Sequence, residues 1–166
     1  MSEGRKPVAG VPKGAKPRSI AVFGSRTLHD DRVRILIMEA IEKEQATRIV
    51  TAQEPVGVCE VGQRVAKDLA IPLEVHFLNF KHLQGAFDRR SRAIVKAADA
   101  FVIVHDGVSK GTTNEMELVR KCGKPMHYHV LEPLPGNRNV GFNLANDFSV
   151  TKEAKKDDVD EDEAWG

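Results

Sequence analysis

The chain has 166 residues, of which 41% are apolar and 30% charged, a composition typical of a single globular domain with a substantial core. The formal net charge of +1 gives no bulk attraction to nucleic acid or to a membrane surface. There is no run of about 18 or more apolar residues, and the two cysteines form no disulfide framework. We therefore expect a cytoplasmic protein with no membrane partner.

Charge is concentrated at the two ends of the chain. Residues 1–18 hold five Lys or Arg and one Glu, whereas residues 152–166 hold three Lys and seven Asp or Glu. Such segments carry too little apolar surface to fold, so both are expected to be disordered. They would flank a domain at 19–131 and a surface-wrapping segment at 132–151. The acidic end can serve as a solubilising tail or dock on a basic partner.

Between the tails, two kinds of pattern alternate. Short apolar runs rich in β-branched residues predict strands at 19–23, 48–52, 73–78, 99–105 and 125–130. Helical periodicity predicts helices at 31–45, 58–70, 85–98 and 116–122, the first capped by Asp30 or Asp31. This alternation predicts an α/β fold, a Rossmann-like doubly wound parallel sheet of about five strands with helices on both faces. Ligands of such sheets bind beyond the carboxyl ends of the strands, where the strand order switches.

The segment 106–115 joins a predicted strand to a predicted helix. A helix start has unpaired N–H groups and a positive dipole end, which attract phosphate. Gly111 would let a ligand approach the backbone closely, and Glu115 would face the same space. An ordinary turn and a capped helix, with Glu115 complementing the dipole, remain the alternative. The further candidates in this segment are Asp106, Gly107, Ser109, Thr112 and Thr113.

Two more loops end at the same edge of the predicted sheet. One is Gly24-Ser25-Arg26, and the other runs from Gln53 to Cys59. Three loops converging on one cleft are a more specific signal than any one of them alone. Arg26 and Arg90 could hold a phosphate by a bidentate fork, or they could form surface salt bridges.

Four motifs in this order resemble those of the SLOG superfamily, in particular its YspA/YpsA-like branch. Related proteins are the lonely-guy phosphoribohydrolases and the DNA-processing protein DprA. The motifs cover roughly residues 20–130: Gly24-Ser25-Arg26, the helix start 57–66, Arg90-Ser91-Arg92-Ala93-Ile94, and the run 106–115. Gly111-Thr112-Thr113-Asn114-Glu115 matches the end of the lonely-guy motif P-G-G-x-G-T-x-x-E. Its Pro-Gly-Gly part is absent, and Cys59 replaces an acidic residue of the branch.

The resemblance implies a Rossmann-like fold that binds a nucleotide or nucleotide-derived ligand. In lonely-guy enzymes, the residues matching Arg90 and Glu115 serve hydrolysis of the N-glycosidic bond of a nucleoside monophosphate. A homodimer or higher homo-oligomer is also implied, and an apolar face on the 31–45 helix favours one. No resident cofactor and no metal are expected. The expected ligand-binding residues are Gly24, Ser25, Arg26, Gly57, Asp106, Gly107, Ser109, Gly111, Thr112 and Thr113.

Cys59 is a further candidate for a nucleophile, and His127 and His129 are candidates for a metal site. Cys59 stands at a predicted helix start, where the pKa of a thiol falls, but no His or Asn stands close by to complete a nucleophilic dyad. His127 and His129 alternate with apolar residues, which indicates one face of a strand rather than a metal pair.

Three classes of function remain open. The first is a module that binds a nucleotide derivative for sensing or sequestration. The second is an enzyme that hydrolyses the N-glycosidic bond, with Glu115 stabilising positive charge on the sugar or activating water. The third is a nucleic-acid binder resembling DprA, which the neutral core and the lack of stacking aromatic residues disfavour.

Overall fold

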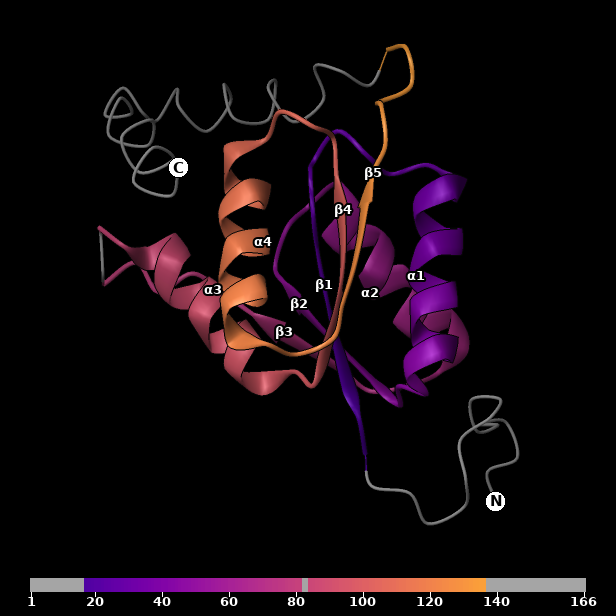
Figure 1. Ribbon diagram of the computed structural model, residues 1–166, viewed down its shortest axis with the longest axis horizontal. Coiled ribbons are helices and arrows are strands. Elements are labelled where there is room, and N and C mark those ends of the chain that lie inside the picture. Colours follow the sequence, from indigo (N-terminus) through magenta and orange to yellow (C-terminus); the bar gives the residue numbers. More distant parts are fainter. Residues whose placement is uncertain (1–16, 82–83, 137–166) are drawn as a thin grey trace.

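The computed structural model describes residues 17–81 and 84–136, and its core is a five-stranded parallel sheet. The predicted acidic tail and most of the predicted basic tail and surface-wrapping segment lie outside these residues. The sheet has the order β3-β2-β1-β4-β5, which confirms the Rossmann-like architecture (Figure 1). The elements are β1 (Ser19–Gly24), α1 (Asp31–Glu44), β2 (Arg48–Ala52), α2 (Val58–Leu69), β3 (Leu73–His76), α3 (Ala86–Ala97), β4 (Ala100–His105), α4 (Lys110–Cys122) and β5 (Met126–Val130).

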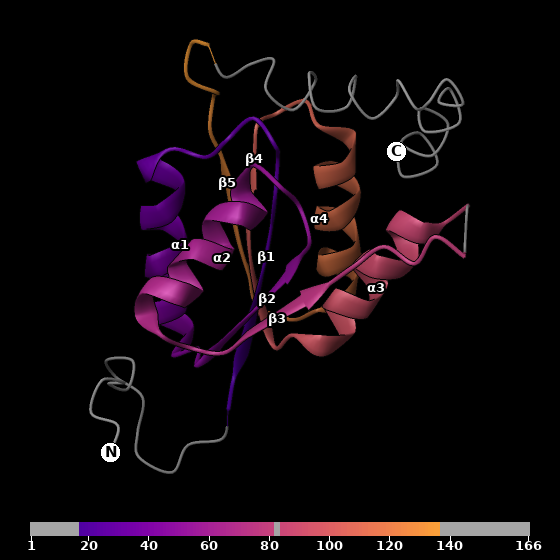
Figure 2. The same cartoon turned by 180° about the vertical axis from the view of Figure 1, so that it is seen from behind.

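Helices cover both faces of the sheet. Figures 1 and 2 show α1 and α2 on one face and α3 and α4 on the other. Successive side chains of a strand point to opposite faces, so β1 supplies both layers of the core. Ile20 and Val22 pack with α1 and α2, whereas Ala21 and Phe23 pack with residues of α3 and α4. The central strands are buried on both sides, which explains their continuous apolar runs.

The first helix follows its sequence signals closely. The Asp30 side chain accepts a hydrogen bond from the Arg32 N–H, so the predicted cap is confirmed. The apolar face is buried within the chain itself, at Val33, Ile37, Ala40 and Ile41. Because this face is covered, the expectation of self-association now rests on the family resemblance alone.

The start of α4 corrects the sequence prediction. The helix begins at Lys110 and not near Met116, so Gly111 and Glu115 belong to its first two turns. Glycine and β-branched threonine are weak helix formers, which is why the sequence favoured a loop there. The Asp106 carboxylate accepts the N–H groups of Val108 and Ser109 and so turns the chain into the helix. The turn that Asp106 fixes before the helix thus outweighs the weak intrinsic propensity.

The switch in strand order lies between β1 and β4. β1 pairs with β2 on one side and with β4 on the other, all in parallel. The helices that follow these two strands, α1 and α4, cover opposite faces, so the loops after β1 and β4 diverge at the carboxyl edge of the sheet. Among the described residues, no helix is both long and apolar enough to cross a membrane.

Candidate ligand-binding site

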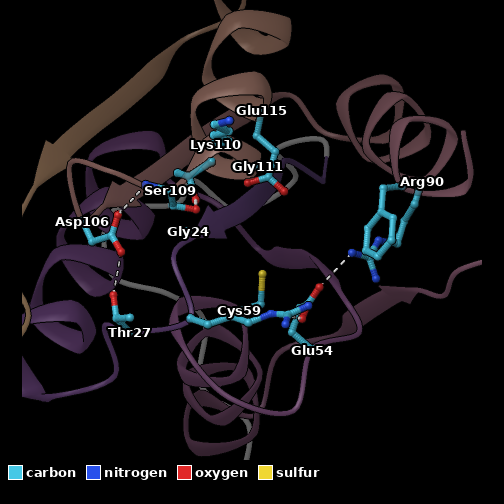
Figure 3. A pocket seen from close by; sticks show the side chains of 13 residues that line it. Gly24, Thr27, Glu54, Cys59, Arg90, Asp106, Ser109, Lys110, Gly111 and Glu115 are labelled. Atoms are coloured by element: carbon cyan, nitrogen blue, oxygen red, sulfur yellow. Dashed lines mark hydrogen bonds and ion pairs between the residues drawn. The ribbon is translucent and has the colours of Figure 1, made fainter. Parts of the chain in front are cut away.

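A cavity of about 390 Å³ opens at the carboxyl edge of the sheet, at this switch point (Figure 3). It is bounded by the loops after β1, β2 and β4 together with parts of α3 and α4. Its lining residues are Gly24, Arg26, Thr27, Glu54, Cys59, Phe87, Arg90, Asp106, Ser109, Lys110, Gly111, Thr112 and Glu115. Eight of the twelve residues expected from the sequence are among them. Ser25, Gly57, Gly107 and Thr113 lie outside the lining and support it.

Ser25 joins the loop after β1 to the loop after β4. It is 1% exposed, its N–H donates to the carbonyl of Val104, and its hydroxyl accepts the N–H of Asp106 at 3.0 Å. The same hydroxyl lies 3.2 Å from that of Thr112, on the first turn of α4. One small buried side chain therefore fixes the relative position of two walls of the cavity.

Asp106 organises the loop that leads into α4. Its Oδ1 accepts the N–H groups of Val108 at 3.0 Å and Ser109 at 2.8 Å, and its Oδ2 accepts the hydroxyl of Thr27 at 2.8 Å. Burial by itself would raise the pKa of Asp106, but these three donors together hold that pKa below its usual value. Gly107 adopts the positive φ of +91° that this turn requires. The carboxylate is thus a structural anchor at the edge of the cavity.

Two glycines allow α2 to pack tightly behind the cavity. A Cβ at Gly24 would lie 2.3 Å from the Cβ of Val58, and a Cβ at Gly57 would lie 2.5 Å from the Cα of Arg26. Gly57 also has φ of +102°, a conformation that other residues rarely adopt. The conformation of the Gly24-Ser25-Arg26 turn therefore depends on close packing as much as on access for a ligand.

The two predicted phosphate-binding arginines meet at a single carboxylate. Glu54, in the loop after β2, accepts the Nε of Arg26 at 3.1 Å and an Nη of Arg90 at 2.8 Å. Their side chains differ in exposure: Arg26 is 31% exposed, Glu54 14% and Arg90 only 5%. Sequence reasoning left ion pairing open for these arginines, and the structure contains it, within the cavity instead of on the open surface.

Arg90 is held from several sides on α3. Its second Nη donates to the carbonyl of Gln53 at 3.2 Å, and its guanidinium lies 5.4 Å from the centre of the Phe87 ring. Its Nε is buried and has no hydrogen-bond partner among the described residues. A buried guanidinium with a spare donor is a strong site for an anion, because the desolvated cation gains most from added negative charge.

Glu115 extends from α4 toward the middle of the cavity, opposite Arg90 (Figure 3). Burial raises the pKa of its carboxyl from 4.5 to about 8, and the negative charge of Glu54 adds to the rise. The cations Arg90 and Arg26 oppose the shift without cancelling it. At neutral pH the group is therefore mostly protonated and can donate a proton or a hydrogen bond.

Cys59 does not have the reactive character that a helix start suggests. Its thiol is 3% exposed and donates to the carbonyl of Val22 at 3.5 Å. Burial raises the pKa of this thiol, and the negative charges of Glu115 and Glu54 raise it further. The expected lowering was wrong because desolvation outweighs the helix dipole at a buried position.

His105, at the end of β4, supports the cavity from behind. Its Nε2 lies 2.9 Å from the carbonyl oxygen of Ser109, which can only accept, so Nε2 is the donor. Its Nδ1 then accepts the hydroxyl of Tyr128, 3.0 Å away on β5. Thr113 donates to the same Ser109 carbonyl at 3.1 Å. These contacts fix Ser109, the N-cap residue of α4, in place.

Three lining residues were not singled out from the sequence: Thr27, Glu54 and Phe87. Lys110 belongs to the 106–115 segment that the sequence did single out. Phe87 precedes Arg90 by three residues, a helical spacing that places them on one face. Glu54 and Thr27 have no local signal, because their partners lie 36 and 79 residues away.

The two histidines of β5 lie on one face of the strand, as predicted. His127 contacts Glu44 of α1 at 2.6 Å, whereas Tyr128 points the other way, toward His105. Within residues 17–81 and 84–136, no group of three or more His, Cys, Asp or Glu is placed to hold a metal ion.

Comparison with known proteins gives a distant structural likeness. No family model and no curated protein matches the chain. Two solved structures of the molybdenum cofactor carrier protein of Chlamydomonas reinhardtii are similar to it, each with a TM-score of 0.47. One is 16% identical and aligns over 78% of this chain and 85% of that chain; for the other the values are 17%, 83% and 86%. Both neighbours carry a small cofactor by name. A likeness this distant says nothing about the ligand of this chain, and membership of the SLOG superfamily stays a prediction from the motifs.

Proposed function

We propose that the cavity binds a phosphate-bearing nucleotide or nucleotide derivative. The observation that carries this proposal is the convergence of Arg26, Arg90 and the first turn of α4 on one cavity at the switch point of the sheet. Guanidinium groups match the geometry of phosphate oxygens. The N–H groups of Lys110, Gly111 and Thr112 are those that a helix start leaves without intrahelical partners. The resemblance to the SLOG motifs supports the same ligand class.

The cavity also has suitable dimensions. Its volume of about 390 Å³ falls within the range of pockets that enclose most of a small organic ligand. Phe87 offers an aromatic surface beside the two arginines. A phosphate near Arg26 and α4 would leave the remaining space for the sugar and part of the base.

Titration calorimetry tests the binding proposal. Nucleoside 5′-monophosphates are compared with the parent nucleosides, which differ only in lacking the phosphate. We expect the nucleosides to bind at least about tenfold more weakly, as loss of a charge-assisted contact implies. Arg26→Gln should weaken binding of the monophosphates. The control is Arg64→Gln, which removes a more exposed charge on α2, where Arg64 pairs with Glu60 outside the cavity. Equal affinity for nucleosides and monophosphates would contradict the proposal.

A second, catalytic proposal is that the bound nucleotide undergoes hydrolysis of its N-glycosidic bond. The raised pKa of Glu115 is the observation that favours it. Breaking this bond builds negative charge on the leaving base, and protonation of the base removes that charge. A carboxyl whose pKa is about 8 can supply the proton at neutral pH. Arg90 would hold the substrate, as the resemblance to lonely-guy enzymes implies. This role differs from the carboxylate role expected from the sequence, because the cavity keeps the group protonated.

The hydrolytic step is tested by chromatography of the products from a panel of ribo- and deoxyribonucleotides. Glu115→Gln keeps the shape of the side chain but removes its proton, so turnover should fall by roughly a hundredfold or more. Turnover should also decline above about pH 8, where the acid loses its proton. If the parent protein releases no free base from any nucleotide, the chain is a non-catalytic binding module. Activity that rises through pH 8 would instead assign Glu115 the role of a base.

A further inference from the structure

Glu54 occupies the position where a ligand anion would be expected. Its two carboxylate oxygens are divided between Arg26 and Arg90, the two guanidinium groups that line the cavity. A carboxylate and a phosphate bind guanidinium in the same planar, forked geometry. The chain therefore supplies, from its own sequence, an anion that competes for both cations.

The charge balance of the cavity makes this competition important. Among the described residues that line the cavity, Lys110 is the one cation besides the two arginines, and Asp106 and Glu54 contribute two carboxylates. A phosphate dianion placed beside an undisturbed Glu54 would meet strong repulsion, since like charges a few ångströms apart are poorly screened at a partly buried site. Moving the Glu54 carboxylate away removes the repulsion and frees both guanidinium groups.

The position of Glu54 in the fold allows such movement. It lies in the short loop between β2 and α2, and its neighbours Gln53 and Pro55 are both exposed. The backbone on either side is anchored, because the Gln53 N–H donates to the carbonyl of His76 at 2.9 Å and Gly57 packs against Arg26. Rotation of the Glu54 side chain would therefore release the arginines without shifting a helix or a strand.

We propose that Glu54 is an internal competitor for the ligand anion, and that it makes the cavity selective for phosphate monoesters. This inference rests on the proposed function. Only an anion that contacts both arginines and the N-terminus of α4 more favourably than a carboxylate replaces Glu54. A phosphate monoester dianion meets this requirement by its charge and its three terminal oxygens. Carboxylates and phosphate diesters carry less charge or fewer free oxygens and are rejected.

The test is titration calorimetry of Glu54→Gln with adenosine 5′-monophosphate, inorganic phosphate and acetate, at constant ionic strength. Glutamine keeps the size of the side chain but removes the competing charge. We expect this variant to bind phosphate and the monophosphate about tenfold or more tightly than the parent, and to gain measurable affinity for acetate. The matched control is Glu60→Gln, which makes the same charge change on α2, where Glu60 pairs with the exposed Arg64 outside the cavity. It should bind like the parent.

A second variant tests the inference independently, in case Glu54→Gln does not fold. Glu54→Asp keeps the charge but shortens the side chain, so it bridges both arginines poorly and should also strengthen phosphate binding. If the parent binds phosphate compounds and both folded variants bind them equally or more weakly, Glu54 only supports the arginines and the inference is wrong. If neither the parent nor any variant binds a phosphate compound, the proposed function fails and this inference fails with it.

Discussion

Thr27 donates a 2.8 Å hydrogen bond to the carboxylate of Asp106, and this bond links two loops that lie 79 residues apart in the sequence. One loop follows β1 and the other follows β4, the two strands that flank the switch point. The link closes one side of the cavity.

Replacing Thr27 by Val should lower the free energy of unfolding by roughly 1–3 kcal/mol, because the Asp106 carboxylate loses a donor. Urea denaturation measures the change. The stabilisation by Asp106 is present above its unfolded pKa and is lost as the pH falls through its lowered folded pKa, so the effect should be largest above about pH 4. Thr113→Val is the control: its exposed hydroxyl bonds only to groups close in sequence, and the expected loss is about 0.5 kcal/mol or less. Equal losses in the two variants would show that the Thr27 link contributes nothing of its own.

Gly57→Ala should be among the most damaging single-methyl changes in the chain. The new Cβ would lie 2.5 Å from the Cα of Arg26, and alanine would have to adopt φ of +102°. Backbone strain and steric overlap together should lower the free energy of unfolding, measured by urea denaturation, by roughly 2–5 kcal/mol. Gly123→Ala separates the two causes, since Gly123 has φ of +76° but no atom within 4 Å of the added Cβ. A similar loss in both variants would mean that packing against Arg26 adds nothing.

The stability of the protein should depend on pH through Glu115. Its pKa is about 8 in the folded chain and about 4.5 when unfolded, so the folded state binds more protons between these values. Stability therefore falls as the pH rises through this window. Glu115→Gln removes this pH dependence. Between pH 5 and pH 8 the free energy of unfolding of the variant should therefore rise relative to that of the parent by roughly 1–4 kcal/mol. Urea denaturation of both proteins across the window measures this, and parallel curves would contradict the raised pKa.

Gly111→Val should block the ligand while leaving the fold intact. Gly111 lines the cavity at the start of α4, and a Cβ there would meet no atom within 4 Å, so the larger side chain would extend into open space. We expect affinity for nucleoside monophosphates to fall at least about tenfold in titration calorimetry. Gly111→Ala is the control for helix propensity and should bind more like the parent while stabilising α4 slightly. If the Val variant binds as tightly as the parent, this turn does not contact the ligand.

The sequence predicted the sheet well because its signals are local and redundant. The central strands are buried on both faces, so runs such as Ala100–His105 carry a continuous apolar pattern. The N-cap at Asp30 and the left-handed Gly123 that ends α4 follow from side-chain chemistry and from glycine's conformational freedom. The sequence placed the start of α4 too late because Gly111 and the threonines have weak helix propensity. The hydrogen bonds of the Asp106 carboxylate, which direct the chain into the helix, could not be predicted from the sequence.

The site was only partly predictable, for a different reason. The loops that follow parallel strands lie at one edge of the sheet, so the position of the cavity followed from topology, whereas Arg90 followed from its motif. Burial, however, is a property of the folded chain. It reversed the expected shift for Cys59 and raised the pKa of Glu115 to about 8. The bridge from Glu54 to Arg26 and Arg90 likewise depends on three distant segments meeting.

The two cysteines lie in opposite environments, and this gives the protein a built-in chemical reporter. Cys122 is exposed at the far end of α4, whereas Cys59 is buried in the cavity wall. A maleimide added to the native protein should therefore modify Cys122 rapidly and Cys59 only when the wall opens, since a buried, protonated thiol is a poor nucleophile. The rate of the second modification, followed by mass spectrometry, would measure opening of the cavity directly. A ligand that fills the cavity should slow it in proportion to its occupancy, without any dye or mutation placed in the site.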